Sequence, residues 1–597
     1  TDHVGSASAG RCLAAASGAA IATDATEPVW SAIDGRPRWR TQRFADIAAR
    51  EDHAAALIAA YREFGREAFA HLSGAWAAAI IDTESGTGLI AVDRVGLRPM
   101  CYACSSDGGL VFGTTVDSVR HHPSVVAEID PQSIYSLLHL TRIPAPDTIY
   151  ADIAKLGPGQ VVEYRAGKAA ISQYWKLDYR QKSAADAESL ASELRNIMRD
   201  AVARCLEGVD PDKVGAFLSG GVDSTTVTGY LAELSPTPPK AFTVGFDAAG
   251  YDEMEFASAA AKHYGVDHRH RYVSPADIIE FLPRMAQMYD EPYANGSAVP
   301  AFYCAQQASE AGVQVMLAGD GGDELFAGNE RYVTQRLFER YFMIPAILRR
   351  NLIEPIVSLL PLDGPQILRL PRSYVRRCNI PLPDRLESYN HFGDIPASEC
   401  FMPEVAKRVD TDRPLATMRT HYRNPDDAST LDRMMYLDMQ TTIADDDIRK
   451  VNRTAEASGV EVRYPLLDEE VVEFSTRLPE ALQLRHGKLR WFFKHAMREM
   501  LPQSTLTKSK HGFGLPFDLW IRTDPALRDF SYGKLADLGK RGIFRPDFVD
   551  ETVAAHRRND THSHGDLVWA MLLLELWFES RHDQPATATP VASVRHT

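Results

Sequence analysis

Residues 214–228 read Val-Gly-Ala-Phe-Leu-Ser-Gly-Gly-Val-Asp-Ser-Thr-Thr-Val-Thr, and this stretch decides the fold class of the chain. An apolar strand runs into a turn of Gly and Ser, which opens onto a helix. Such a turn directs several backbone N–H groups and the positive end of the helix at one point. Gly220 and Gly221 lack the Cβ atoms that would keep phosphate oxygens away. The pattern therefore predicts a phosphate site between Ser219 and Ser224.

Asp223 lies inside this turn, where a negative group beside phosphate needs an explanation. A Mg²⁺ ion that bridges the carboxylate and the phosphates supplies one. The alternative is an ordinary turn that caps a helix. The Walker A pattern G-x-x-x-x-G-K-[ST] is not the motif here, because no such run occurs in the chain.

A second loop of glycines and acids follows the strand-like run 313–318 and reads Gly-Asp-Gly-Gly-Asp-Glu over residues 319–324. Its acids, Asp320, Asp323 and Glu324, lie close together, which is costly unless a cation or a proton relieves their charge. We therefore expect Asp323 to be a second Mg²⁺ ligand and Asp320 to be an active-site acid. The alternative is a solvated acidic turn. Both loops follow apolar strands, where open parallel sheets bind their ligands.

The rest of the chain divides by its hydrophobic pattern. Short apolar runs with few helices predict a sheet-rich α+β domain at 1–178. Its clearest strands are expected at 77–82, 88–92, 110–112 and 160–164, and its clearest helix at 54–65. Alternating strands and helices over 214–325 predict a parallel α/β sheet in a second domain at 185–582, whose C-terminal portion is mostly helical. Residues 583–597, rich in Ala, Thr and Pro, are expected to be a disordered tail.

Composition limits the class of protein. The 597 residues include 65 basic and 80 acidic side chains, a net charge of −15. This charge argues against non-specific binding to nucleic acid or to an anionic membrane. No apolar stretch reaches the roughly 20 residues that span a bilayer, and no signal-peptide pattern opens the sequence. Seven cysteines in so long a chain do not indicate a disulfide framework, so a cytoplasmic location is expected.

Several later motifs, together with the two loops, resemble the asparagine synthetase superfamily of ATP pyrophosphatases. The matching segments are Phe242-Thr-Val-Gly-Phe246, Tyr251-Asp-Glu253, Lys450-Val-Asn-Arg453, Glu461-Val-Arg-Tyr-Pro-Leu-Leu-Asp468 and Lys508-Ser-Lys-His-Gly-Phe-Gly-Leu-Pro516. Their number and order make the resemblance specific. It implies a synthetase domain with a parallel sheet, which uses ATP and Mg²⁺ to adenylate a carboxylate for capture by an amine.

The resemblance also implies roles for individual residues. ATP would contact Ser219, Gly220, Gly221, Asp223, Ser224, Val244 and Gly319, and Mg²⁺ would bind Asp223 and Asp323. Lys510 would stabilise the charge that develops in adenylation and aminolysis, unless it is only a surface lysine of its loop. Arg490 replaces a lysine common in the family, and Asp320 replaces a Glu or Tyr important to amine chemistry; both remain catalytic candidates. Asn452 replaces a family Asp, a change without an interpretation from the sequence.

The first domain resembles the Ntn-type glutaminase domain of asparagine synthetases, but with residues of its chemistry replaced. Scaffold segments remain at 72–74, 93–99, 156–159 and 174–175. The family needs an N-terminal Cys, whereas this chain begins with Thr1. Asp34-Gly35-Arg36 stands where the family has Asn-Gly-Glu, and His53-Ala54-Ala55 where it has Asp-Thr-Glu. A terminal Thr can be a nucleophile in related hydrolases, but we predict an inactive glutaminase.

Without ammonia made from glutamine, the nucleophile is expected to be an amine of the substrate. Relatives with a dead or missing glutaminase include β-lactam synthetases and the cyclases of lasso peptides. We favour macrolactam closure of a lasso precursor peptide, in which the N-terminal amine attacks an activated Asp or Glu side chain. A companion protease and a leader-binding protein would then be partners.

Two alternatives stay open. One is amidation of a small acid or sugar acid by free ammonia or an external amine, because Gly-Asp-Gly-Gly-Asp-Glu at residues 319–324 is closer to ordinary asparagine synthetases than to lactam formers. The other is a non-catalytic scaffold, which any substrate-dependent release of pyrophosphate would reject.

Overall fold

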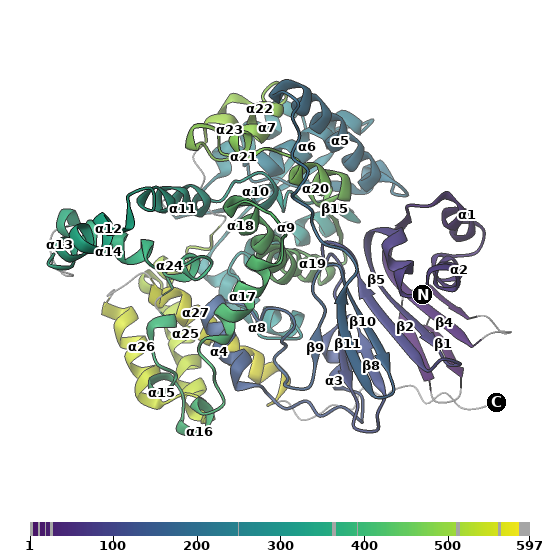
Figure 1. Cartoon of the computed structure of the whole chain (residues 1–597), viewed down its shortest axis with the longest axis horizontal. Coiled ribbons are helices and arrows are strands. Elements are labelled where there is room, and N and C mark those ends of the chain that lie inside the picture. Colours follow the sequence, from purple (N-terminus) through teal and green to yellow (C-terminus); the bar gives the residue numbers. More distant parts are fainter. Residues whose placement is uncertain are drawn as a thin grey trace.

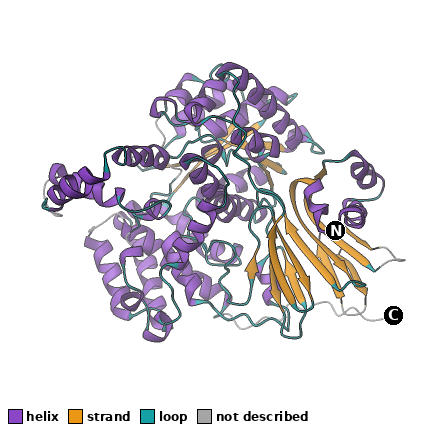
Figure 2. Cartoon of the chain, viewed as in Figure 1, coloured by secondary structure: helices purple, strands orange, loops and turns teal. Residues whose placement is uncertain are grey.

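The computed structural model divides the chain into an N-terminal part of antiparallel sheets and a larger part built on a parallel sheet (Figure 1). Figure 2 shows the antiparallel strands gathered at one side of the molecule and helices over most of the rest. The predicted combination of α+β and α/β architecture is confirmed. The structure describes residues 4–9, 12–17, 20–23, 28–248, 250–360, 366–390, 392–508, 514–558 and 563–583. Thr1, Lys510 and the predicted tail beyond Asp583 lie outside these residues.

The N-terminal part centres on a six-stranded antiparallel sheet in the order β11-β10-β6-β5-β4-β3. Its strands are β3 (Ala20–Thr23), β4 (Val29–Trp39), β5 (Leu72–Asp82), β6 (Thr87–Val92), β10 (Gln160–Arg165) and β11 (Lys168–Gln173). The remaining strands form a β1-β2 hairpin and a β8-β7-β9 sheet: β1 (Val4–Ala9), β2 (Cys12–Ser17), β7 (Cys101–Cys104), β8 (Leu110–Gly113) and β9 (Ala154–Lys155). The four expected strands and the expected helix, α2 (His53–Phe64), are confirmed.

Both faces of this sheet are buried, because alternate side chains of β5 enter two different cores. Ala78 and Ile80 belong to a core that also holds Leu57 of α2. Ala77 and Ala79 belong to a second core on the opposite face. Successive strand residues point to opposite faces, so the run of small apolar residues in β5 fits a strand covered on both sides.

The larger part centres on a five-stranded parallel sheet in the order β14-β13-β12-β15-β16. Its strands are β12 (Val214–Phe217), β13 (Lys240–Phe246), β14 (Asp267–Val273), β15 (Val315–Leu317) and β16 (Glu461–Arg463). The apolar runs predict β12, β13 and β15. They do not predict β14, a polar edge strand, or β16, which begins and ends with a charged residue. After β14 the chain crosses to the other side of β12, which makes a switch point between β12 and β15.

Helices cover both faces of the parallel sheet. On one face lie α5 (Ala187–Leu206) and α6 (Val222–Leu234), in the same core as Val315 and Leu317 of β15. On the other face lie α8 (Pro275–Met288) and α9 (Ala298–Glu310), in the same core as Met316. The helical period predicted for α5 is confirmed by its buried stripe, Leu190, Leu194, Met198 and Val202.

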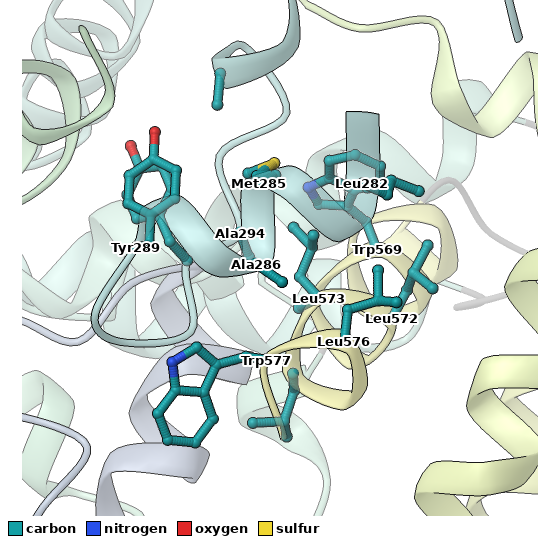
Figure 3. Packing of buried hydrophobic residues seen from close by; sticks show 14 of the residues in the cluster. Leu282, Met285, Ala286, Tyr289, Ala294, Trp569, Leu572, Leu573, Leu576 and Trp577 are labelled. Carbon is teal, nitrogen blue, oxygen red and sulfur yellow. The ribbon is translucent and has the colours of Figure 1, made fainter. Parts of the chain in front are cut away.

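The apolar helix α27 (Ser563–Arg581) packs against α8 and anchors the C-terminal helices to the sheet. Figure 3 shows Trp569 and Leu573 of α27 beside Leu282 and Met285 of α8, with Trp577 farther along α27. Full burial of one such side chain stabilises the fold by about 1.5–3 kcal/mol. Within the described residues, no helix combines the length and the apolar character needed to cross a bilayer.

A group of short helices at residues 330–378, called the arm below, projects from the body of the molecule (Figure 1). It consists of α11 (Glu330–Tyr341), α12 (Ala346–Leu348), η3 (Arg349–Ile353), α13 (Glu354–Ser358) and α14 (Gln366–Cys378). The arm has a small core of its own, formed by Phe338, Tyr341, Val375 and Cys378.

Candidate active site

The loop after β12 forms an anion-binding turn at the start of α6. The Ser219 N–H donates to Ser224 Oγ at 3.1 Å, and the two hydroxyl oxygens lie 2.9 Å apart. Gly221 is the N-cap of α6, and no side chain caps this end of the helix. The first N–H groups of a helix need acceptors, and together they favour a negative group. The turn therefore has the predicted form for binding phosphate oxygens.

Two glycines of the loops are required by packing between segments. Gly220 has a φ of +70°, and a Cβ there would lie 2.5 Å from the carbonyl carbon of Phe256 in α7 (Met254–Tyr264). The expectation that Gly220 leaves room for phosphate is therefore wrong, because the position that a Cβ would occupy is filled by the backbone of α7. Gly221 keeps that role, since a Cβ there would meet only Ser219 Oγ, at 3.2 Å. A Cβ on Gly319 would lie 2.7 Å from the Ser224 backbone nitrogen, so Gly319 lets the two loops touch.

A cavity of about 1050 Å³ lies between the two loops, at the carboxyl ends of the central strands. Ligands of open α/β sheets bind at this switch point, here between β12 and β15. The predicted residues that line the cavity are Ser219, Gly221, Asp223, Ser224, Val244, Gly319, Asp320, Asp323 and Arg490. The structure thus brings together the predicted residues of the described part, with Gly220 set behind the loop.

Arg490 joins the two carboxylates that were expected to bind Mg²⁺. Its Nη1 lies 3.0 Å from Asp223 Oδ2, and its Nε donates to Asp323 Oδ1 at 2.6 Å. Burial disfavours the charge of Arg490, but the two aspartates outweigh burial and raise its pKa. Arg490 is also the N-cap of α22 (Trp491–Ala496), and its backbone N–H donates to Ala327 O. These contacts fix the guanidinium between the two loops.

Asp223 and Asp323 fit a shared divalent cation by their chemistry and convergence. Mg²⁺ prefers oxygen ligands and is bound by one or two carboxylates, while substrate phosphates and water supply the rest. Both carboxylates reach the same guanidinium, so both face one point of the cavity. The cavity wall at Gly328 packs closely against Arg490, because a Cβ on Gly328 would lie 2.3 Å from Arg490 Nε. The residues present therefore fit a cation held jointly with phosphate.

Lys450 links two further acids of the cavity. Its Nζ donates to Asp447 Oδ1 at 2.5 Å and lies 3.9 Å from Asp320 Oδ1. Burial raises the pKa of Asp320 to about 6, Lys450 opposes this rise, and Asp447 adds to it. Asp447 ends the π-helical segment η6 (Met439–Asp447), and Lys450 lies in the first turn of α19 (Ile448–Glu456). Asp320 is therefore a carboxylate that can exchange a proton near neutral pH.

Lys508 connects the loop after β12 to the segment Tyr251-Asp-Glu253. Its Nζ lies 2.9 Å from Glu253 Oε1 and donates to Ser219 O at 3.2 Å. Sequence reasoning assigned no role to Lys508, Lys450 or Asp447. The two lysines could have been found from their place in the motifs of the resemblance, whereas Asp447 has no signal of its own in the sequence.

Models of two families match the chain. The model described as asparagine synthase matches residues 193–579, and the one described as glutamine amidotransferase domain matches residues 46–175. The chain belongs to the asparagine synthase family. The family uses ATP, generally with Mg²⁺, and its asparagine synthetases are carbon–nitrogen ligases that form AMP.

Relatives named asparagine synthetase are similar over most of the chain. Glutamine-hydrolyzing asparagine synthetase 1 of Bacillus subtilis is 25% identical over 524 residues, which are 87% of this chain and 80% of the relative. A putative glutamine-hydrolyzing asparagine synthetase of Mycobacterium tuberculosis is 26% identical over 565 residues, 92% of this chain and 83% of the relative. Amidase chyE of Penicillium rubens is 25% identical over 310 residues, 49% of this chain and 45% of the relative.

In this asparagine synthase family member, a second cavity of about 600 Å³ lies where the N-terminal part meets the synthase part. Arg36 and His53 line it. Arg36 Nη2 donates to Glu207 O at 2.9 Å, and its Nη1 lies 3.9 Å from Glu461 Oε1. Trp39 Nε1 lies 3.2 Å from His53 Nδ1, within donating distance. Arg36 thus connects the two parts of the chain, whereas the hydrogen bond of His53 to Trp39 stays within the N-terminal part.

Asn452 also connects the two parts of the chain. Its Nδ2 donates to Leu97 O at 3.1 Å, and its Oδ1 accepts from the Tyr464 hydroxyl at 2.8 Å. Leu97 belongs to the retained segment 93–99, where the Asp93 carboxylate accepts successive backbone N–H groups. The replacement of a family Asp by Asn452 therefore has a structural meaning: an amide can donate to the carbonyl of Leu97, and a carboxylate cannot.

Proposed function

We propose that this chain is an ATP-dependent, AMP-forming amide synthetase that closes a macrolactam in a lasso precursor peptide. The observation that carries the proposal is that Asp223, Asp323 and Arg490 converge in the same cavity as Asp320 and Lys450. The first group fits the phosphates and Mg²⁺ of ATP, and the second fits an amine that must lose a proton. At about 1050 Å³ the cavity is as large as the largest common ligand sites, so it has room for ATP and the reacting end of a peptide.

ATP would lie along the ends of β12 and β13. The N–H groups at the start of α6, with Ser219 and Ser224, would hold phosphate oxygens, and Val244 would border the adenine. Asp223 and Asp323 would hold Mg²⁺, which neutralises phosphate charge when it is bound. Arg490 would then exchange one carboxylate for a phosphate oxygen, because a guanidinium binds either group in the same forked geometry.

The amide would form in two steps, adenylation and aminolysis. First, an oxygen of the substrate carboxylate attacks the α-phosphorus, and pyrophosphate leaves. Then the amine nitrogen attacks the acyl carbon, AMP leaves, and the nitrogen gives up a proton. Asp320 accepts that proton, and Lys450 favours its ionised form. Lys510 would stabilise charge on the reacting oxygens, as the resemblance implies, while the cavity supplies positioning.

The amine does not come from glutamine in this proposal. Arg36 stands where the glutaminase family has a glutamine-contacting Glu, and it is engaged with Glu207 and Glu461 of the synthase part. Residues 53–55 are His-Ala-Ala, so they offer no carboxylate to hold the amino group of glutamine. We therefore propose that glutaminase activity is lost. Release of ammonia from glutamine above the rate of heat-inactivated protein would reject this part.

The substrate and its partners follow from the resemblance. The activated group would be an Asp or Glu side chain of the precursor, and the nucleophile its N-terminal amine. A companion protease would expose that amine and a leader-binding protein would deliver the peptide, in the cytoplasm where ATP is available. The second candidate is amidation of a small acid or sugar acid by free ammonia or an external amine. The names of the Bacillus and Mycobacterium relatives favour this second candidate.

Mass spectrometry distinguishes the two candidates. Purified protein is incubated with ATP, Mg²⁺ and a linear lasso core peptide, and we expect AMP together with a peptide lighter by one water. Lys510→Ala and Asp323→Asn serve as blanks. AMP that forms only with ammonia and a small acid would favour the second candidate. Protein that binds no ATP in the presence of Mg²⁺ would contradict both.

A further inference from the structure

Large apolar side chains are exposed on the arm in unusual number. Fifteen large hydrophobic residues of the described part are exposed, and nine of them belong to the arm. These nine are Leu337, Phe342, Met343, Ile347, Leu348, Leu352, Ile356, Leu359 and Leu370. Scattered apolar residues on a surface need no explanation, but a gathered patch indicates a site of interaction.

The patch is not needed for the folding of the arm itself. The core of the arm is made by Phe338, Tyr341, Val375 and Cys378, which are buried. Leu359, Met343 and Ile347 are instead 85%, 82% and 74% exposed. Side chains this open contribute little to the stability of the chain, so another surface must account for them.

The charge of the arm is opposite to that of the whole chain. Residues 330–378 contain nine arginines, no lysine and four acidic residues, a local charge of +5 in a chain of −15. Arg340, Arg350 and Arg376 are exposed on the same arm as the apolar side chains. Interleaved arginines and large apolar residues are typical of segments that lie in the headgroup region of an anionic bilayer.

We propose that the arm attaches this protein to an anionic lipid surface. Figure 1 shows α12, α13 and α14 at the end of the molecule remote from the antiparallel sheets, so a flat surface reaches them without meeting the body. The apolar side chains enter the boundary between headgroups and acyl chains, and the arginines bind lipid phosphates. The whole-chain charge predicted no membrane contact, because it averages a basic arm with an acidic body.

Attachment through the arm would also fix the position of the candidate active site relative to the lipid surface. Asn329 lines the large cavity and is the N-cap of α11, the first helix of the arm. The cavity therefore reaches the root of the arm, at the start of α11, while the lipid contact lies at the other end of the arm.

Vesicle flotation of the full chain tests the proposal. We expect flotation with mixed phosphatidylglycerol and phosphatidylcholine vesicles, and little with phosphatidylcholine alone. The double variant Ile347→Asp, Leu359→Asp should bind at least about tenfold more weakly, because it removes two apolar side chains from the interface. The matched control is Val126→Asp with Ile171→Asp, which makes the same charge change at two exposed positions of the N-terminal part. The control should float like the wild type.

Three results would overturn the proposal. One is the absence of wild-type flotation with the anionic vesicles. Another is equal binding by the arm variant and the control. The third is self-association of the wild type, measured by analytical ultracentrifugation, that the arm variant abolishes while neither protein floats. That last result would assign the patch to a second copy of the chain.

Discussion

Arg490 donates its Nε to Asp323 Oδ1 at 2.6 Å, although 167 positions separate the two residues along the chain. The same guanidinium lies 3.0 Å from Asp223 through Nη1. Two carboxylates that face one point repel each other unless a cation lies between them. Arg490 supplies that cation from the start of α22, so three separate segments meet at the predicted phosphate and metal site.

Replacement of Arg490 by Ala should remove most of the adenylation activity. We expect pyrophosphate exchange, driven by the peptide that is cyclised, to fall by about 10²–10³-fold, because a preorganised charge at the phosphates is lost. Arg490→Lys keeps the charge without the forked geometry, and we expect a loss of no more than about tenfold. Near-ultraviolet circular dichroism checks that both variants are folded. Exchange by Arg490→Ala at the wild-type rate would mean that the guanidinium serves structure alone.

Asp320 should set the acid side of the pH profile of amide formation. The carboxylate must be ionised to accept a proton, and burial raises its pKa to about 6. The rate should therefore fall as the pH decreases through about 6. Asp320→Asn should lower amide formation by about 10²-fold and remove this dependence, while pyrophosphate exchange stays within a few-fold of wild type. An equal loss in both assays would point to a structural effect.

Gly319→Ala should separate the two loops. The new Cβ would lie 2.7 Å from the Ser224 nitrogen and 2.9 Å from its Cα. Backbone atoms at that distance must shift, so we expect a loss of about 1–3 kcal/mol of stability and a KM for ATP raised by about tenfold or more. Gly533→Ala in α25 (Pro525–Leu538) is the matched control, because nothing lies within 4 Å of the added Cβ. That helical substitution should stabilise by about 0.5–1 kcal/mol and leave KM unchanged.

Glu469, the first residue of α20 (Glu469–Thr476), should make stability depend on pH. Arg40 and Arg94 both approach its Oε2, at 3.2 and 3.4 Å. Burial raises the pKa of Glu469 to about 7, although Arg94 and Arg40 oppose the rise. A raised pKa in the folded state means that the protonated form is favoured by folding. Its contribution is complete below the ordinary pKa of Glu and is lost as the pH rises through about 7.

The corresponding measurement is urea unfolding of wild type and Glu469→Gln across pH 5 to 8, a window set by these pKa values. Gln has no charge to bury, so the wild type should lose up to about 3 kcal/mol more than the variant over this range. The difference between the two curves removes the contributions of other titrating groups. Parallel curves would show that Arg40 and Arg94 keep Glu469 ionised throughout.

Much of the fold was predictable because its signals are local. The strand, the Gly–Ser turn and the helix start around Ser219 lie within 15 consecutive residues of sequence. The stripe of α5 repeats at helical spacing, and the strands of the N-terminal part alternate with turn residues. By contrast, β14 and β16 have no apolar run of their own, and their place in the sheet depends on hydrogen bonds to β13 and β15.

The sequence by itself determined the two glycine-rich loops at residues 219–224 and 319–324, the order of the two domains and the family to which they belong. Only the tertiary structure decided that Arg490 lies between Asp223 and Asp323, that Lys508 pairs with Glu253, and that Gly220 faces α7. The physical reason is the range of the interactions. Turn and helix patterns arise from neighbours along the chain, whereas these contacts join segments that meet only after the parallel sheet has brought its loops to one edge.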